Sequence, residues 1–221
     1  SRKDGGSFVA GPMLVIAGAG TGKTMTLAHR VAHLVIEGTN PERILLLTFT
    51  RRAAEEMTRR VENIVRATTR DAVPLPAGGL PWSGTFHSVA NRLLRHFAGN
   101  LGLDPGFSVL DRGDAADMLD VVRHERRLSR TSRRFPKKDT CLAIDSRSVT
   151  AQKSLNETLE QFYPWCSDWA DELADLFRYY VERKQHCQSL DYDDLLLYWS
   201  HLVADAEFAR EIGGWFDHVL V

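Results

Sequence analysis

A glycine-rich octapeptide between a short apolar run and a helical pattern constrains the fold of this chain more than any other feature. The apolar run spans Met13 to Ala17, and its branched side chains are typical of a buried parallel strand. After Thr24, apolar residues recur at helical spacing until Gly38, and Pro41 prevents the helix from continuing. These helical positions are Leu27, Val31, Leu34 and Val35. The sequence therefore predicts a strand, a tight loop and a helix in succession.

The octapeptide, residues 17–24, reads AGAGTGKT and matches the phosphate-binding P-loop, with alanine at its first glycine position. Small residues let backbone N–H groups curl around phosphate oxygens, and the helix N-terminus adds partial positive charge. Lys23 is expected to contact the β and γ phosphates, and the Thr24 hydroxyl to ligate Mg²⁺. A turn that only packs strand against helix is the alternative, but it has no need for Lys followed by Thr. The predicted nucleotide-site residues are Ala17, Gly18, Ala19, Gly20, Thr21, Gly22, Lys23 and Thr24, with Lys23 and Thr24 as the catalytic pair.

Strand and helix patterns continue to alternate after the first helix. Residues 44–49 form a second apolar run, and Ala53 to Val65 carry a helical pattern with charged residues on its polar face. Ser83 to Phe86 resemble a third short strand, followed by a helix from His87 to Phe97. This order is typical of an α/β fold with a parallel sheet and right-handed crossovers.

Beyond Gly102 the chain becomes mainly helical. Helices are predicted from Asp114 to Arg127 and from Ser154 to Cys187, the latter broken at Pro164, and we interpret residues 99–188 as an inserted helical subdomain. A helix from Asp191 to Ala204 and an apolar strand over 218–221 complete the pattern. Residues 1–98 and 189–221 are accordingly assigned to one core domain.

A P-loop alone does not specify a reaction, because several classes of phosphoryl-transfer protein share it. The chemistry requires a carboxylate at the end of a neighbouring strand to hold Mg²⁺. Asp111 is one candidate, although Arg112 follows it and a helix-capping or turn role is favoured. The acidic residues Asp191, Asp193 and Asp194 open a helix, where negative charge is favourable, instead of ending a strand.

Charge is balanced over the whole chain but not locally. Lysine plus arginine total 28 and aspartate plus glutamate total 29, so a polyanionic partner must be recognised by local patches. One basic segment contains a single acid, Glu125, and is either a solvated loop or a contact for duplex phosphates. Its basic residues are Arg123, Arg126, Arg127, Arg130, Arg133, Arg134, Lys137 and Lys138.

The cysteines and the apolar runs exclude several other classes. Cys141, Cys166 and Cys187 lie more than about twenty residues apart, which supports neither a zinc ribbon nor a disulfide framework and indicates a reducing compartment such as the cytoplasm. The longest apolar stretch, around residues 13–22, is too short to span a membrane.

Three segments together resemble a known family. Residues 17–24, 47–57 and 84–88 are similar in sequence, order and spacing to motifs I, Ia and Ib of the UvrD/Rep-type superfamily 1 DNA helicases. The resemblance extends through residues 190–196 to 215–221, and so covers essentially the whole chain. It implies a RecA-like core that uses ATP and Mg²⁺, contacts single-stranded DNA and a duplex junction, and works 3′-to-5′ with a second RecA-like core outside this chain.

The resemblance also assigns DNA contacts. Phe49, Thr50 and Arg51 would lie along the single strand, and Thr85, Phe86 and His87 would form a second contact. Short polar side chains can hold phosphates, and aromatic rings can stack on bases without reading sequence. Core packing is the alternative for the two phenylalanines, and a buried hydrogen-bonded residue or helix cap is the alternative for the histidine.

The chain also departs from the family pattern. The family's Asp-Glu pair would follow Val221. The magnesium acid and catalytic glutamate are therefore expected to be absent, and the chain alone is expected to hydrolyse ATP negligibly. Residues 1–11 contain no glutamine to read adenine, and Met25, assigned to the nucleotide site, stands where many relatives carry arginine. A compact P-loop phosphotransferase using Asp111, and a DNA-binding module with a vestigial nucleotide site, remain alternatives.

Overall fold

A small parallel sheet lies at the centre of the α/β part of the molecule. The computed structural model describes residues 11–16, 18, 20–70, 75–76, 79–128 and 135–221. Its central strand β1 (Ile44–Thr48) pairs in parallel with β2 (Ser83–Thr85) on one side and β5 (His218–Leu220) on the other. Leu46 therefore lies opposite both Ser83 and Leu220. The predicted α/β class with parallel strands is confirmed.

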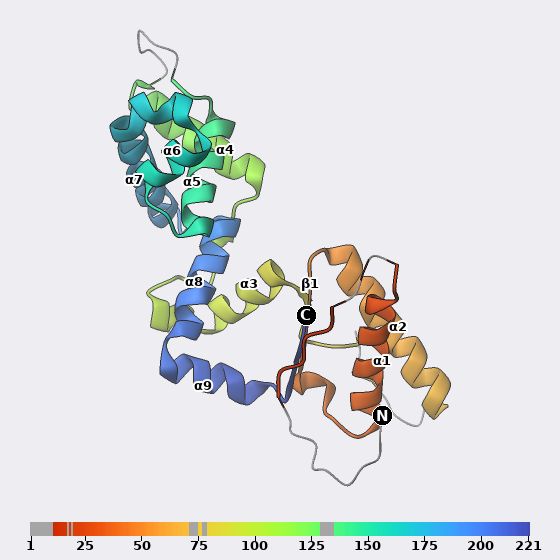
Figure 1. Ribbon diagram of the computed structural model, residues 1–221. Helices are drawn as coiled ribbons and strands as arrows, with labels where there is room; N and C mark the ends of the chain where they lie inside the picture. Colours follow the sequence, from red (N-terminus) through yellow and green to blue (C-terminus); the bar gives the residue numbers. More distant parts are fainter. Residues whose placement is uncertain (1–10, 17, 19, 71–74, 77–78, 129–134) are drawn as a thin grey trace.

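Both faces of β1 are covered, which explains its unbroken apolar sequence. Ile44 and Leu46 face a core shared with α1 (Lys23–Ile36) and α2 (Arg51–Thr69). Leu45 and Leu47 face a second core, to which α3 (Phe86–His96), α8 (Tyr192–Ala204) and α9 (Ala206–Trp215) contribute. Figure 1 shows α1 and α2 on one side of β1, with α3 and α9 on the other. The sheet is thus the middle of three layers.

An ion pair joins the two strands that are farthest apart in sequence. Arg43, in the short 3₁₀ helix Pro41–Arg43, donates from Nε and Nη2 to the two carboxylate oxygens of Asp217, each at 2.7 Å. The backbone N–H of Asp217 donates in turn to the Arg43 carbonyl at 2.9 Å. Hydrogen bonding to Arg43 holds the pKa of Asp217 below its ordinary value. This two-pronged contact aligns the start of β5 with the start of β1.

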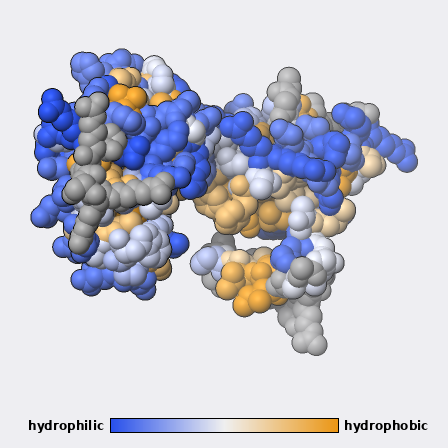
Figure 2. Space-filling model, turned by 90° about the horizontal axis from the view of Figure 1, so that it is seen from above, coloured by the Kyte–Doolittle hydropathy of each residue, from blue (hydrophilic) through white to orange (hydrophobic). Residues whose placement is uncertain are grey.

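Four helices form a separate hydrophobic core at the other end of the molecule (Figure 1). They are α4 (Arg112–Glu125), α5 (Lys138–Ala151), α6 (Leu155–Phe162) and α7 (Ala170–His186), here called the helical cluster. Leu119, Ile144, Leu176 and Tyr180 are fully buried in this core. A 3₁₀ helix, Pro164–Trp169, separates α6 from α7, so the predicted break at Pro164 is confirmed. Seen from above, the surface of this end is mostly hydrophilic, and hydrophobic surface gathers nearer the middle of the molecule (Figure 2).

A second, two-stranded parallel sheet joins the helical cluster to the rest of the molecule. It pairs β3 (Ser108–Val109) with β4 (Ser189–Leu190), after the 3₁₀ helix Ala98–Leu101. Asp111 follows β3 and caps α4, since its Oδ1 accepts the Asp114 N–H at 2.9 Å. The favoured capping role of Asp111 is confirmed. Its sheet is separate from that of β1, so its position gives no support to a magnesium role beside the P-loop.

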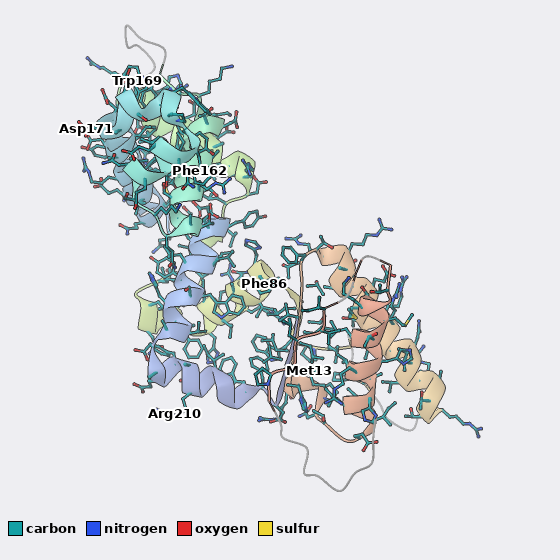
Figure 3. All side chains as sticks on the ribbon, in the orientation of Figure 1. Met13, Phe86, Phe162, Trp169, Asp171 and Arg210 are labelled. Carbon is teal, nitrogen blue, oxygen red and sulfur yellow. The ribbon has the colours of Figure 1, made fainter. Side chains whose placement is uncertain are left out.

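The predicted strand over Met13 to Ala17 is wrong for the residues that can be assessed. Residues 11–16 have no regular secondary structure, and Ala17 lies outside the described part of the chain. Leu14 and Ile16 are 84% and 88% exposed, and Figure 3 shows Met13 at the side of the sheet. An apolar run becomes a strand only where another strand satisfies its backbone groups. Within the described residues, no strand pairs with this segment.

No described helix is long and apolar enough to cross a membrane.

The sequence did not predict two of the helices, α5 and α9. α5 was missed because Ser, Thr and Asp interrupt its few apolar positions, such as Cys141 and Ile144. α9 was missed because its Gly213–Gly214 pair resembles a turn more than a helix.

The two-faced core predicts a large difference between two Leu→Ala substitutions. Leu93 on α3 is fully buried in the core beneath β1, so Leu93→Ala should cost about 2–5 kcal/mol of unfolding free energy. Leu14→Ala, at an exposed position, should change it by less than about 0.5 kcal/mol. Chemical denaturation of this chain followed by circular dichroism measures both. Equal costs would contradict the packing described for one of the two sites.

Candidate functional site

The P-loop segment forms a turn that leads directly into α1. Gly20 and Gly22 have φ values of +76° and +87°, a left-handed conformation that glycine adopts without strain. The Thr21 hydroxyl donates to the Gly18 carbonyl at 2.8 Å and closes the turn. Ala17 and Ala19, two of the predicted site residues, lie outside the described part of the chain. The glycines at positions 20 and 22 therefore have the backbone conformation that a tight loop requires.

Lys23 and Thr24 occupy the first turn of α1, at the exposed end of the helix. The Lys23 ammonium folds back over the loop and donates to the Gly18 carbonyl at 2.6 Å. Gly22 is the N-cap and offers no side chain to the first N–H groups of the helix. Thr24 and Met25 are exposed beside them. Backbone N–H groups, an ammonium and a hydroxyl on one exposed helix end suit a triphosphate with its Mg²⁺.

The two predicted DNA-contact blocks lie side by side because their strands are paired. Thr48 at the end of β1 lies opposite Thr85 at the end of β2, so residues 49–51 and 85–87 leave the sheet at the same edge. Thr50 Oγ1 accepts the Ala53 N–H at 3.1 Å and starts α2, and Thr85 Oγ1 accepts the Ser88 N–H at 3.2 Å and starts α3. The register alone therefore brings together two blocks that are separated by more than thirty residues in sequence.

Gly84 lets α3 begin immediately after β2. A Cβ atom at this position would lie 2.3 Å from the Ser88 hydroxyl oxygen, which donates to the Thr85 carbonyl at 2.9 Å. A larger residue would therefore displace the first turn of the helix that carries Phe86 and His87.

Aromatic rings connect the two blocks. Phe49 is 92% exposed, so core packing does not explain it, and its ring lies 6.2 Å from that of Phe86. Phe86 is half-buried and also contacts Trp199 of α8, with ring centres 6.2 Å apart. Figure 3 shows Phe86 between the helical cluster and the α1–α2 layer. Phe86 therefore packs partly in the core, against Trp199, and also lies beside the exposed ring of Phe49.

Tyr192, which the sequence interpretation did not single out, extends this aromatic surface. Its ring centre lies 5.2 Å from that of His87, and its side chain is 39% exposed at the start of α8. Burial lowers the pKa of His87, against the opposing effect of the Asp193 carboxylate. We call Phe49, Phe86, His87 and Tyr192 the aromatic face. The sequence did contain a signal for this position, because Tyr192 directly follows the aspartate that caps α8. The sequence analysis interpreted the neighbouring acids only as favourable charge at a helix N-terminus.

A buried lysine anchors the helix that carries Tyr192. Lys184 of α7 is 5% exposed, and its ammonium donates to Asp191 Oδ2 at 2.7 Å and Asp194 Oδ2 at 2.6 Å. Tyr180 also donates to Asp191 Oδ2, at 2.9 Å. Burial alone would lower the pKa of Lys184, but the carboxylates of Asp194 and Asp191 raise it above its ordinary value. The sequence identified the acids as a helix N-terminus and missed their buried cation.

The helices at the predicted site differ from the others in first-turn charge. α1, α2 and α3 carry no acidic residue in their first turns, and α2 begins with Arg51 and Arg52. Each of α4 to α9 carries at least one aspartate or glutamate there, as helix N-termini generally favour. Among the described α-helices, the three that follow the P-loop and the two predicted DNA-contact blocks are thus the ones whose first turns lack acids.

Comparisons with known proteins agree with this geometry. The UvrD/REP helicase N-terminal domain matches residues 3–221. This chain belongs to the UvrD/REP helicase family. It is 35% identical over 189 residues to the ATP-dependent DNA helicase PcrA of Bacillus subtilis, covering 85% of this chain and 23% of the relative. PcrA proteins of Staphylococcus epidermidis and Staphylococcus aureus are 33% and 30% identical over 190 residues, covering 85% of this chain and 24% of each relative. The chain spans about a quarter of the length of these curated relatives.

The basic segment of this UvrD/REP family chain is partly neutralised. Arg123 pairs with Asp120 through Nε at 2.8 Å, Lys138 pairs with Asp117, and the Arg126 guanidinium lies 3.8 Å from the ring centre of Tyr179. Three further members, Arg130, Arg133 and Arg134, lie outside the described residues. Within the part that is described, no group of three or more His, Cys, Asp or Glu side chains could hold a metal ion. Acids of α4 therefore balance the charges of Arg123 and Lys138, whereas Arg126 keeps its positive charge against the neutral Tyr179 ring.

Asp145 on α5, which lies near the acids at the start of α8, predicts a pH-dependent stability. Burial raises the pKa of Asp145 on α5 to about 7; Lys184 opposes this rise, while Asp191, Asp194 and Asp193 add to it. An unfolded aspartate ionises near pH 4, so the contribution of Asp145 to the stability of the folded state falls as pH rises from about 4 to 7. Asp145→Asn stays neutral and should be more stable than the wild type at pH 8, by on the order of 2 kcal/mol, with little difference at pH 4.

Denaturation of the chain in urea at pH 4, 6 and 8 measures this effect. Glu160→Gln, at an exposed position of α6, is the matched control and should follow the wild-type profile. A profile for Asp145→Asn that parallels the wild type would show that Asp145 is ionised in the folded protein.

Proposed function

We propose that this chain is the ATP-binding N-terminal part of an ATP-dependent DNA helicase that moves 3′-to-5′ along single-stranded DNA. In this proposal residues 1–98 and 189–221 form an incomplete first RecA-like core, and residues 99–188 form an inserted helical subdomain. The observation that carries the proposal is that α1, α2 and α3, the helices beginning at the three motifs, lack first-turn acids. Membership of the UvrD/REP family, whose PcrA members are ATP-dependent DNA helicases, supports the same proposal.

The nucleotide site is proposed at the start of α1. The N–H groups from Gly18 to Thr24 would surround the triphosphate, and Lys23 would leave the Gly18 carbonyl to neutralise the β and γ phosphates. The Thr24 hydroxyl would bind Mg²⁺. Bound ATP supplies the phosphoanhydride bond whose hydrolysis provides the free energy. Met25, exposed on the same turn, would border the nucleotide.

Single-stranded DNA is proposed to cross the edge where β1 and β2 end. Thr50, Arg51 and Thr85 offer backbone and side-chain donors for phosphates beside the N-termini of α2 and α3. The aromatic face offers rings on which bases can stack without sequence preference. The remaining cations of the basic segment, including the exposed Arg127 and Lys137, would meet phosphates of the duplex junction. A second RecA-like core, contributed by the longer protein, would close over the nucleotide.

The nucleotide proposal predicts that Lys23→Ala removes ATP hydrolysis. In the full-length protein we expect DNA-stimulated turnover to fall at least about a hundred-fold, because no other side chain of the loop supplies a full positive charge. A steady-state phosphate-release assay measures this fall. Lys153→Ala, at an exposed position between α5 and α6 and outside the basic segment, is the control and should retain activity.

The same assay separates the alternatives. The 221-residue chain alone is expected to turn over ATP negligibly compared with the full-length protein. Full-length protein that turns over no ATP but binds DNA, with or without the Lys23→Ala substitution, would favour a vestigial nucleotide site. Turnover by the isolated chain that is lost in Asp111→Asn would revive the compact phosphotransferase.

The DNA proposal predicts that single truncations on the aromatic face weaken DNA binding. Phe49→Ala and Tyr192→Ala should each raise the Kd for a labelled oligothymidylate roughly ten-fold, since one stacked base contributes about 1–3 kcal/mol. Fluorescence anisotropy at fixed salt measures the Kd. Trp165→Ala removes another exposed aromatic ring, from the 3₁₀ helix between α6 and α7, and should leave the Kd unchanged. An unchanged Kd in both aromatic-face variants would place the DNA elsewhere.

A further inference from the structure

The strongest unassigned feature is the buried group of charged residues between α7 and α8. Lys184 and Asp191 are both nearly inaccessible, with side chains 6% and 8% exposed. Isolated buried charges are strongly unfavourable, and this lysine is matched by two carboxylates and by the face of the Tyr180 ring 4.5 Å away. The geometry of such a group is narrowly defined, because each member must keep its partners to remain buried.

The acids of this group also fix where α8 begins. Asp191 is the N-cap of α8, and its Oδ1 accepts the Asp194 N–H at 2.9 Å. Asp194 Oδ2 accepts the Asp191 N–H at 2.9 Å, which completes a reciprocal capping box. Lys184 binds the same Oδ2 atom of Asp194 and the second carboxylate oxygen of Asp191. One ammonium on α7 therefore holds both members of the cap of α8.

Tyr192 is the next residue after this cap. Its ring contacts His87, and Tyr192 also lines a cavity of about 160 Å³. The cavity lies where β3 and α4 meet α5 and the start of α8. It is lined by Leu110, Asp111, Arg112, Ala115, Leu142, Ser146, Asp191, Tyr192 and Asp193. Because Tyr192 borders a cavity, the position of the backbone at the start of α8 helps to determine where its ring lies.

We propose that Lys184 is a positioning residue for DNA binding, which holds the capped start of α8 so that Tyr192 lies against His87 on the aromatic face. This inference rests on the proposed function, because it assigns a role in placing a DNA-stacking ring. Lys184 itself is buried and touches no DNA. It links α7 of the helical cluster to the exposed ring through two hydrogen-bonded carboxylates.

A purely structural role predicts something different. If the ion pairs only stabilise the fold, their loss lowers stability without any specific dependence on Tyr192. If Lys184 acts through Tyr192, its loss matters for DNA only while the tyrosine is present. A double-mutant cycle distinguishes the two, since coupled residues give non-additive effects.

The test uses the full-length protein and a labelled oligothymidylate. Lys184→Met removes the ammonium while keeping a chain of similar length, and it should raise the Kd roughly ten-fold, as loss of one stacked base does. In a Tyr192→Ala background the same substitution should change the Kd less than about two-fold. DNA-stimulated hydrolysis should show a matching rise in the DNA concentration for half-maximal activity, with kcat at saturating DNA unchanged.

Two further variants keep the test decisive. Lys153→Met removes an exposed ammonium, between α5 and α6 and outside the basic segment, that hydrogen-bonds to Gln161, and it should bind DNA as the wild type does. Lys184→Met/Asp194→Asn removes one buried positive and one buried negative charge together, so the buried group keeps the same formal net charge as in the wild type. This double variant should still bind DNA more weakly, because Asp191 has lost its anchor on α7.

The possible outcomes distinguish a failure of the proposed DNA-binding function from a failure of the positioning role of Lys184. Wild-type protein that does not bind oligothymidylate would overturn the proposed function and this inference with it. Wild-type binding combined with an equal effect of Lys184→Met in the wild-type and Tyr192→Ala backgrounds would overturn the positioning role alone. Normal binding by Lys184→Met or by the charge-matched double variant would do the same.

Discussion

The burial of β1 on both faces is the constraint on which the rest of the α/β part depends. Because Ile44 and Leu46 require one helical layer and Leu45 and Leu47 require another, helices from both ends of the chain must pack around a five-residue strand. Parallel pairing then fixes which loops meet, since Thr48 opposite Thr85 places two distant blocks at one edge. The candidate DNA surface is in this sense a consequence of strand register, and its exposed residues lie where two buried strands end.

The helical cluster has its own core and connects to the sheet through few elements. The two-residue pairing of β3 with β4, the contacts of α5 with α8, and the Lys184 group form this junction. Asp193, which lines the same cavity as Ser146 of α5 and lies near His87, belongs to it as well. A junction built from charged and polar groups is sensitive to geometry in a way that an apolar contact is not, because every displaced partner leaves a buried charge.

The elements with strong local signals could be predicted from sequence, and the contacts between distant residues could not. The helix after the P-loop, the break at Pro164 and the strand at 218–220 follow from periodicity and from proline, which act locally. The prediction of a strand at Met13 failed because a strand must pair with another strand, and no local sequence pattern shows whether such a partner is present. Lys184 was missed for the same reason: it is seven residues from Asp191, and only the packing of α7 against α8 shows that the lysine is buried.

The chain has a net charge near zero, but its acidic and basic residues are distributed unevenly among the helix N-termini. An acid in a first turn stabilises a helix by about 0.3–1 kcal/mol, and cations there work in the opposite sense. α1 begins with Lys23 and α2 with Arg51 and Arg52, so each forgoes a stabilisation that α4 to α9 retain. A local loss of helix stability of this kind is typical of a binding site, where the positive helix N-terminus and the nearby cations are left without acids so that they can bind a ligand. An anion at these two N-termini, whether triphosphate or DNA phosphate, would supply the missing negative charge, which is why the position of the cations is more informative than their number.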